Sequence, residues 1–210
     1  MEAHLEKCYN DTVHGRTKIN NEISSLPGMS GLLTRIFYNN LLTMEDSRYL
    51  EIGTYAGSSL CSAMYGNKAN ITVIDNWSEF GGKDEFYTNF NNHKGENNVQ
   101  IIDDDCFSED IISKLKFKYN IYLYDGNHSS ESHRKALTHF IDALDDTFIF
   151  VIDDWNWAKV REGTMKGIEE CNLKILKKLE VRLTDDDEHT PQLLAKLTWH
   201  NGIACFVLKK

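Results

Sequence analysis

Short apolar runs alternate with longer, more polar stretches through the middle of the chain. Five of these runs have the length and the β-branched and aromatic content of buried strands; they are residues 48–53, 70–75, 98–103, 120–125 and 147–153. The stretches between them are better interpreted as helices; they are residues 58–66, 82–94, 107–116 and 129–144. This alternation predicts a parallel sheet that helices cover on both faces.

The two ends of the chain add further predicted elements. Residues 30–44 carry an apolar stripe with helical spacing, and Ser30 is the expected N-cap of that helix. Near the C-terminus, two more strands are predicted at residues 180–184 and 202–210. Together the patterns predict a doubly wound α/β domain with a helical N-terminal cap.

Composition narrows the class of protein. A chain of 210 residues has the size of one domain, which we expect to comprise a helical cap at residues 1–45 and one compact unit at residues 46–210. The formal net charge of −9 argues against nucleic acid or membrane as the main partner, because both attract clustered Lys and Arg. Five scattered cysteines, no signal-peptide pattern and no apolar run near ~20 residues predict a soluble, cytoplasmic protein.

The segment after the first predicted strand indicates a bound cofactor. It reads EIGTYAGSS from Glu51 to Ser59, with glycines only at Gly53 and Gly57. Such glycines let the backbone turn tightly against a ligand, but the absence of G-x-G-x-x-G disfavours NAD. The turn suits an adenosyl group with an amino-acid tail, whose ammonium, held directly or through water, would be the partner that a buried Glu51 needs. Asp75, at the end of the second strand, is placed to accept hydrogen bonds from both ribose hydroxyls.

Acidic residues recur where the predicted strands end, and ligands of open parallel sheets bind at that edge. Asp125 ends the fourth strand, and Asp153 and Asp154 end the fifth. Three carboxylates at one rim repel each other unless a cation joins them, and such oxygens favour Mg²⁺, Mn²⁺ or Ca²⁺. Because successive strand residues point to opposite faces, the pair can share a metal only where the strand has begun to turn. The simpler alternative is that Asp favours strand-ending turns.

His128 follows Asp125 by three residues, in the loop expected to border the cofactor. Its ordinary pKa of about 6.5 suits removal of a hydroxyl proton. A lone histidine, however, is more often a surface residue or one that supports a site indirectly. His133 and His139 fall on the next predicted helix and are expected to be packing or surface residues.

Five short motifs, in this order, resemble those of a known family: LEIGTYAGSS, VIDNW, IIDDDCF, LYDGNHS and FVIDDW, within about residues 45–160. They are similar to class I S-adenosylmethionine-dependent O-methyltransferases. The nearest likeness is the metal-dependent branch of macrocin O-methyltransferase, other sugar O-methyltransferases and cephalosporin-hydroxylase-like proteins. The resemblance implies a Rossmann-like, mostly parallel seven-stranded sheet with an antiparallel last strand. It also implies S-adenosylmethionine as cofactor, S-adenosylhomocysteine (SAH) as product, and Mg²⁺ or Mn²⁺ as the metal.

The same resemblance implies roles for individual residues. Asp125, Asp153 and Asp154 would be metal ligands, and His128 would be the catalytic base with Asp125 beside it. Asp104 stands where the family often has glycine. The residues expected to bind the cofactor are Glu51, Gly53, Thr54, Tyr55, Ala56, Gly57, Ser58, Ser59, Asp75, Asn76, Trp77, Asp105, Cys106 and Asp125.

The expected acceptor is a hydroxyl of a sugar or glycan, for example a deoxyhexose such as rhamnose, because D-G-x-H and D-D-W look more like the sugar branch. Residues 184–201 could form a lid over it or a solvated insertion. Trp77 would cover the adenine or, equally, pack against a helix. Aromatic residues that could line the acceptor site, with core packing as the alternative for each, are Phe80, Phe86, Tyr87, Phe90, Trp155 and Trp157.

Other functions stay open at this point. A catechol or phenol acceptor is compatible with the same fold and metal. A non-catalytic module that binds S-adenosylmethionine or a glycan would keep the glycine turn but has no need of the acids and His128. A nucleic-acid methyltransferase is disfavoured by the charge and by the absence of an N-P-P-Y-type motif. The chain could act as a homo-oligomer or as one module of a larger glycan-processing polypeptide.

Overall fold

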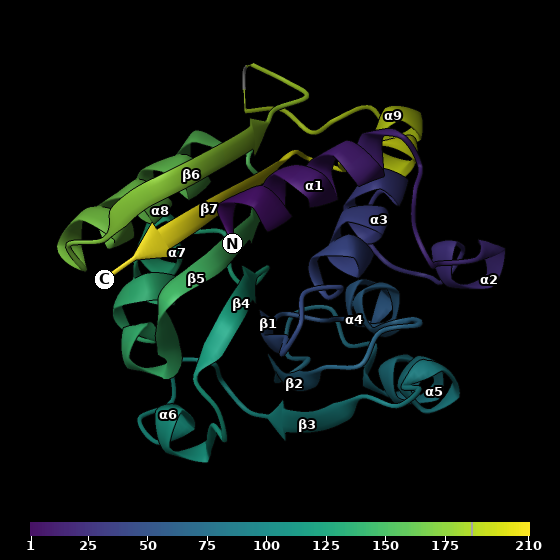
Figure 1. Cartoon of the computed structure of the whole chain (residues 1–210), viewed down its shortest axis with the longest axis horizontal. Coiled ribbons are helices and arrows are strands. Elements are labelled where there is room, and N and C mark those ends of the chain that lie inside the picture. The colour runs from purple at the N-terminus through teal and green to yellow at the C-terminus, as the bar shows by residue number, and fades with distance from the viewer. Residues whose placement is uncertain (186) are drawn as a thin grey trace.

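The computed structural model describes residues 1–185 and 187–210 and has a seven-stranded sheet at its centre (Figure 1). The strand order is β3-β2-β1-β4-β5-β7-β6. β7 is antiparallel to both of its neighbours and the other pairs are parallel. The strands are β1 (Arg48–Ile52), β2 (Asn70–Asp75), β3 (Asn98–Asp103), β4 (Tyr119–Tyr124), β5 (Leu144–Asp153), β6 (Lys174–Val181) and β7 (Ile203–Lys209). The predicted doubly wound sheet with an antiparallel last strand is confirmed.

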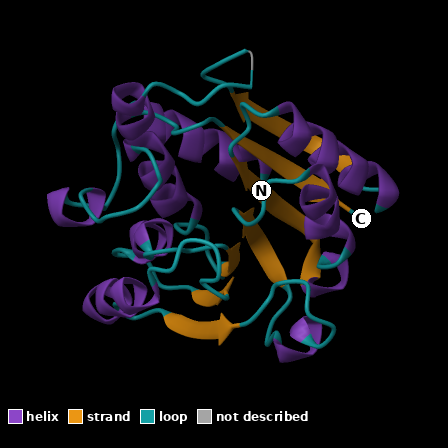
Figure 2. Cartoon of the chain, turned by 180° about the vertical axis from the view of Figure 1, so that it is seen from behind, coloured by secondary structure: helices purple, strands orange, loops and turns teal. Residues whose placement is uncertain are grey.

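Helices cover both faces of the sheet (Figure 2). One face carries α1 (Glu2–Val13), α3 (Leu32–Leu41), α4 (Ser58–Met64) and α5 (Lys83–His93). The other carries α6 (Ile111–Lys114), α7 (Ser130–Thr138) and α8 (Ala158–Glu170). The short elements are α2 (Asn21–Ser24), η1 (Ile141–Ala143) and α9 (Gln192–Leu197). Across the described ranges, no helix combines the length and apolar character needed to cross a membrane.

The central strands are apolar throughout because the sheet is buried on both sides. In β5, Phe148, Phe150 and Ile152 pack into the cluster formed with α7 and α8. Ile149 and Val151, which alternate with them, pack into the opposite cluster formed with α3 and α4. All five side chains are fully buried. A strand of this kind therefore appears in the sequence as a short continuous apolar run, as predicted.

The sixth strand differs from its prediction. The sequence placed a strand at residues 180–184, whereas β6 runs from Lys174 to Val181. β6 is an edge strand, and its pairing with β7 shifts register between Ile175 and Lys177. Lysines on an edge strand discourage unwanted pairing with another sheet. Here they also interrupt the apolar pattern that identifies the inner strands.

The start of α3 is also corrected. Gly31, and not Ser30, is its N-cap. A Cβ atom on Gly31 would lie 2.1 Å from the carbonyl oxygen of Thr198, and the Leu33 N–H donates to that same oxygen at 3.0 Å. The close approach of the chain after α9 therefore requires a glycine here. This contact joins the N-terminus of α3 to the segment that precedes β7.

Candidate active site

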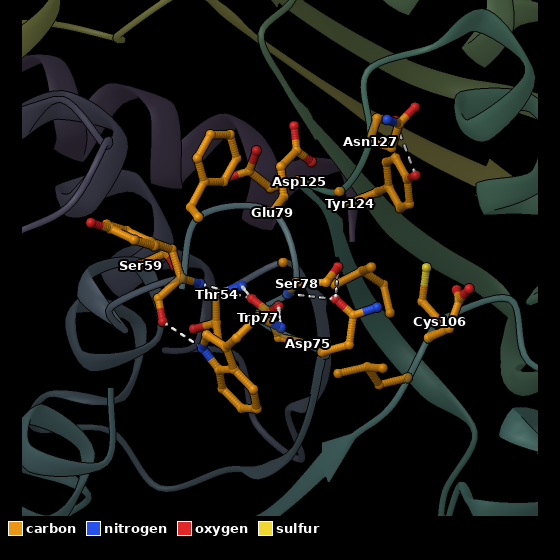
Figure 3. Close-up of a pocket in the computed structure, with 18 of the residues that line it drawn as sticks. Thr54, Ser59, Asp75, Trp77, Ser78, Glu79, Cys106, Tyr124, Asp125 and Asn127 are labelled. Atoms are coloured by element: carbon orange, nitrogen blue, oxygen red, sulfur yellow. Dashed lines mark hydrogen bonds between the residues drawn. The ribbon is translucent and has the colours of Figure 1, made fainter. Parts of the chain in front are cut away.

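A cavity of about 380 Å³ opens at the carboxyl ends of β1, β2 and β4 (Figure 3). The strand order reverses between β1 and β4, and open α/β sheets bind ligands at such a point. Eleven of the residues predicted to bind the cofactor line the cavity, namely Gly53, Thr54, Tyr55, Ser58, Ser59, Asp75, Asn76, Trp77, Asp105, Cys106 and Asp125. Lining residues that sequence reasoning did not select include Met29, Ser30, Ser78, Asn127 and Ser132.

The glycine turn forms the floor of the cavity. Gly53 has a φ of 81°, in the left-handed region, and a Cβ there would lie 2.0 Å from the carbonyl oxygen of Asp125. The turn after β1 is thus packed against the end of β4 at a distance that only glycine allows. Gly57, with a φ of 85°, is the N-cap of α4 and lies outside the cavity lining, as does Ala56.

Glu51 is fully buried beneath this floor and does not line the cavity. Its carboxylate accepts hydrogen bonds from the Tyr49 hydroxyl (2.8 Å) and the Ser59 hydroxyl (2.6 Å). Burial raises the pKa of Glu51 to about 7, although the hydrogen bonds from Ser59 and Tyr49 work in the opposite direction. The predicted role of Glu51 toward the ammonium of the cofactor, directly or through water, stays a prediction. Its link to the cavity is Ser59, which lines it.

Asp75 is oriented by three backbone N–H groups (Figure 3). Those of Thr54 (2.8 Å) and Tyr55 (2.9 Å) donate to Oδ2, and that of Trp77 (2.7 Å) donates to Oδ1. Each carboxylate oxygen has two lone pairs, so Oδ2 is fully used and Oδ1 keeps one position for a ligand. Asp75 therefore has an acceptor position free for a ribose hydroxyl, and the predicted contact with both hydroxyls stays a prediction.

Trp77 serves mainly in packing. Its indole N–H donates to the Tyr55 carbonyl at 2.8 Å, and its ring centroid lies 5.1 Å from that of Phe86. Only 7% of the residue is exposed. Trp77 is also one of the residues that line the cavity, but its ring packs against Phe86 of α5. Of the two roles weighed for Trp77, these contacts support packing against a helix.

The acids at the ends of β4 and β5 meet beside the cavity. Burial, and then the charges of Asp153 and Asp154, raises the pKa of Asp125 well above its ordinary range. Burial, followed by the charge of Asp154, raises the pKa of Asp153 to about 7. Burial opposes ionisation of Asp154 as well, but the neighbouring His200 and His128 outweigh it and lower its pKa. The pKa values of the three acids thus diverge, as expected for carboxyl groups that are buried close together.

The strand turns between the two adjacent acids. Asp154 has a φ of 56°, in the left-handed region, directly after β5 ends at Asp153. Because the extended geometry stops there, both side chains can face the same space. Together with His200 they offer ligand atoms that all lie within 4.8 Å of one another. Asp125 was predicted as the third ligand, but in this structure it lies outside that group.

His200 was missed by sequence reasoning, which placed it in a lid or a solvated insertion at residues 184–201. In its described part this stretch is held in place: the Thr190 N–H donates to the Asn201 side chain at 3.0 Å. Asn156 also donates to the Thr190 hydroxyl at 3.1 Å. His200 reaches Asp154 because β7 runs antiparallel beside β5. No local sequence signal reports that pairing.

His128 lies between the cavity and the acids. Its Nε2 is 3.1 Å from Oδ2 of Asp154, and burial lowers its pKa from the ordinary value. Nδ1 is buried and has no hydrogen-bond partner among the described residues. The Asp154 carboxylate at this distance favours the protonated ring and so opposes the effect of burial on the pKa of His128. His133, predicted as a packing residue, is fully buried on α7.

The predicted aromatic residues fall into two groups. Phe86 and Phe90 stack on each other and are buried. Trp155 packs on Phe206 of β7 with 1% exposure. Phe80, in contrast, is 62% exposed, lines the cavity, and its ring lies 6.3 Å from that of Tyr55. Residues close to the candidate site thus include Phe80 and Trp157, whose ring lies 5.2 Å from that of His128.

The fold and this site define a class of protein, and comparison with known families identifies it. The family model described as "Methyltransferase domain" matches residues 50–155, which is half of the chain. The chain belongs to this methyltransferase family. A search of curated proteins gave no match.

Solved structures confirm the Rossmann-like methyltransferase fold. An O-methyltransferase from Bacillus cereus in complex with SAH has a TM-score of 0.61 and 11% identity, covering 100% of this chain and 92% of that one. An SAH-bound methyltransferase from Podospora anserina has a TM-score of 0.61 and 13% identity, with coverages of 100% and 89%. Precorrin 8W decarboxylase from Methanobacterium thermoautotrophicum has a TM-score of 0.56 and 15% identity, with coverages of 91% and 96%. Since their named activities differ, the reaction has to be argued from the site.

Proposed function

We propose that this protein is an S-adenosylmethionine-dependent O-methyltransferase that uses a divalent cation and methylates a hydroxyl of a sugar or glycan. One observation carries the proposal: Asp125 lines the cavity at the end of β4 and also adjoins the acids at the end of β5. A donor bound in the cavity and a cation held by the acids would therefore meet at the same residue. Cation-assisted transfer to a hydroxyl requires the methyl donor and the cation to lie close together.

The cavity fits S-adenosylmethionine in several respects. Asp75 keeps one acceptor position on Oδ1 for a ribose hydroxyl. Ser58 and Ser59, at the start of α4, offer hydroxyl groups to an amino-acid tail, while Cys106 and Phe107 supply less polar walls for a base. The SAH named with two of the similar structures supports the same cofactor class.

The acids fit a divalent cation. Oδ1 of Asp153 and Oδ1 of Asp154 are buried and have no hydrogen-bond partner within the described ranges. Buried carboxylate oxygens normally accept hydrogen bonds, and leaving two without one is costly. A cation would satisfy both and would favour the ionised form of each acid.

The chemistry follows from these positions. S-adenosylmethionine supplies an electrophilic methyl group, and a bound divalent cation lowers the pKa of a hydroxyl that contacts it. His128 would take the hydroxyl proton, and the Asp154 carboxylate, 3.1 Å from Nε2, would stabilise the charged form of the ring. The cavity residues would hold the donor in line with the acceptor oxygen, so positioning provides much of the rate.

The cavity rim supports a sugar acceptor. Phe80 offers an exposed aromatic face, and such faces commonly cover the apolar side of a sugar ring. Glu79, Asn127 and Ser132 line the same cavity and can exchange hydrogen bonds with hydroxyl groups. A catechol would use the aromatic face but would leave most of these polar groups without partners.

The test is a labelled-methyl transfer screen against deoxyhexoses, other sugars, glycans and catechols, with Mn²⁺, with Mg²⁺ and with excess chelator. We expect cation-dependent transfer to a sugar hydroxyl. His128→Ala and Asp154→Asn should each lower the rate by about 10²-fold or more, while calorimetry still detects S-adenosylmethionine binding. His14→Ala, at an exposed histidine that is the C-cap of α1, is the matched control and should keep full activity.

Three results would contradict the proposal in different ways. Equal activity in excess chelator would contradict the role of the cation. Transfer to catechols alone would contradict the sugar acceptor. Binding of S-adenosylmethionine without transfer to any acceptor class would favour a non-catalytic binding module.

A further inference from the structure

We propose that His200 is a ligand of the cation site, alongside Asp153 and Asp154, and that this nitrogen donor makes the site prefer a transition-metal ion such as Mn²⁺ or Co²⁺ over Mg²⁺. The inference rests on the proposed function only in requiring that a cation binds at these acids. In this inference the predicted ligand set of three carboxylates is replaced by a set of two carboxylates and one imidazole.

The three side chains converge on one small space. Their ligand atoms all lie within 4.8 Å of one another, and Nδ1 of His200 is 3.7 Å from Oδ1 of Asp154. That separation is too long for a hydrogen bond. Oδ1 of Asp153, Oδ1 of Asp154 and Nδ1 of His200 are all buried atoms without a hydrogen-bond partner among the described residues.

The burial of these atoms makes their lack of partners informative. Asp153 is 4% exposed and Asp154 is 5% exposed. Buried polar atoms are rarely left unpaired, and exceptions mark functional positions or an ion. Two carboxylate oxygens and one imidazole nitrogen that lack hydrogen bonds, on three side chains whose ligand atoms converge, match the donor set of a cation site.

The backbone holds His200 in this position from both sides. The Asn156 N–H donates to the Asn201 carbonyl at 2.9 Å and the Trp155 N–H donates to the Gly202 carbonyl at 3.3 Å, which extends the pairing of β5 with β7. On the other side, the His200 N–H donates to the Ala195 carbonyl at 3.2 Å, at the end of α9. His200 itself has a φ of 56°. The backbone of His200 is therefore fixed by the fold before any ion binds.

Ligand chemistry gives the metal preference. Mg²⁺ favours oxygen donors and water, whereas imidazole favours first-row transition ions. Most sites bind Co²⁺ more tightly than Mg²⁺ whatever their ligands. The informative quantity is therefore the change in affinity for each ion when the His200 nitrogen is removed. His200→Asn suits the test, since Asn tolerates a left-handed φ and replaces nitrogen by an amide oxygen. We expect it to weaken Co²⁺ binding by roughly tenfold or more and Mg²⁺ binding by less than roughly threefold.

The experiment combines calorimetry with pulsed electron paramagnetic resonance of the full chain loaded with Mn²⁺. We expect coupling of Mn²⁺ to a histidine nitrogen in the unsubstituted protein, with a frequency that changes when its histidines carry the heavy nitrogen isotope. The coupling should disappear in His200→Asn and persist in His128→Asn and His14→Asn. Isotope labelling identifies a histidine ligand even where a variant does not fold, and circular dichroism checks folding.

The outcomes separate this inference from the proposed function. Mn²⁺ binding that is lost in Asp154→Asn but shows no nitrogen coupling would overturn the role of His200 and leave the cation-dependent reaction intact. Coupling that disappears in His128→Asn instead of His200→Asn would assign the nitrogen to the other histidine. No cation binding at all would overturn both the inference and the cation part of the proposed function.

Discussion

Glu51 is a carboxyl group in the core whose hydrogen-bond partners are two hydroxyl groups. It is fully buried at the end of β1, where Tyr49 and Ser59 donate to it. Hydroxyl groups satisfy its oxygens but do not neutralise its charge, so the proton binds more tightly than in the unfolded chain. The same residue that links the sheet to the cavity through Ser59 therefore makes the protein without ligand sensitive to pH.

Replacing Glu51 by Gln measures this effect. The pKa of Glu51 is about 7 in the folded protein and 4.5 ordinarily. Its raised folded pKa stabilises the fold fully below the ordinary value, and that stabilisation is lost as the pH rises through 7. Between pH 4 and pH 8 the free energy of unfolding should therefore fall by about 3 kcal/mol more in the native chain than in Glu51→Gln. Urea unfolding at both pH values, without cofactor, tests this, and an equal change in both proteins would contradict it.

Gly53 is a position where backbone proximity, and not flexibility alone, demands glycine. Gly53→Ala would place a Cβ 2.0 Å from the Asp125 carbonyl oxygen. We expect a loss of at least about 2 kcal/mol in the free energy of unfolding and weaker S-adenosylmethionine binding.

Gly81→Ala is the matched control for that substitution. Gly81 also lines the cavity and has a φ of 68°, but no heavy atom lies within 4 Å of the added Cβ. The free energy of unfolding of Gly81→Ala should fall by about 1 kcal/mol, which is the cost of placing alanine in a left-handed conformation. Equal losses in the two variants, measured by urea unfolding, would show that the clash at Gly53 is relieved by movement of β4.

At the scale of elements, α3 anchors the segment that closes one side of the cavity. Arg35 of α3 is 4% exposed, and its guanidinium donates to backbone carbonyls of the preceding segment. The same segment contributes Met29 and Ser30 to the cavity lining. A buried guanidinium with several fixed donors can bind several carbonyls at once. The acceptors are Ile23, Ser24, Leu26 and Ser30.

Arg35→Lys should loosen this segment without removing the charge. A lysine cannot reproduce the forked set of donors, so we expect S-adenosylmethionine to bind roughly tenfold more weakly, as the loss of one or two hydrogen bonds implies. Proteolysis at residues 23–30 should also become faster. Arg134→Lys, in the exposed ion pairs of α7, is the control and should change neither. Unchanged affinity in Arg35→Lys would show that the segment does not take part in binding.

At the scale of the whole molecule, the site lies where separate parts of the fold converge. The cavity is formed by the ends of β1, β2 and β4, and the acids follow β4 and β5. His200 precedes β7, which returns antiparallel beside β5. A ligand that binds at these strand ends needs all of them in place, so it binds only the folded chain and raises the free energy of unfolding of the whole protein.

Ligand-dependent melting tests this global coupling. S-adenosylmethionine or SAH at 100 times its dissociation constant should stabilise the protein by about 2.7 kcal/mol. For a chain of this size that corresponds to a rise in melting temperature of roughly 5–10 °C. NAD at the same concentration should produce no shift. A shift with NAD, or none with S-adenosylmethionine, would contradict the cofactor assignment.

The sequence by itself determined the order of the elements and the edge of the sheet at which the site lies. Strands such as β5 are buried on both faces, so their apolar runs are visible without knowledge of their neighbours. Asp75, Asp125 and Asp153 mark the carboxyl ends of those runs, and parallel pairing brings such ends together. The motif order then predicted the methyltransferase family.

The tertiary structure decided which side chains meet. His200 lies beside Asp154 because two antiparallel strands pair, and Trp77 turns its ring toward Phe86 because its indole N–H is bound to the Tyr55 carbonyl. The limits of β6 likewise depend on its place at the edge of the sheet. These features arise from contacts between residues far apart in the chain. Local composition and periodicity carry no record of such contacts.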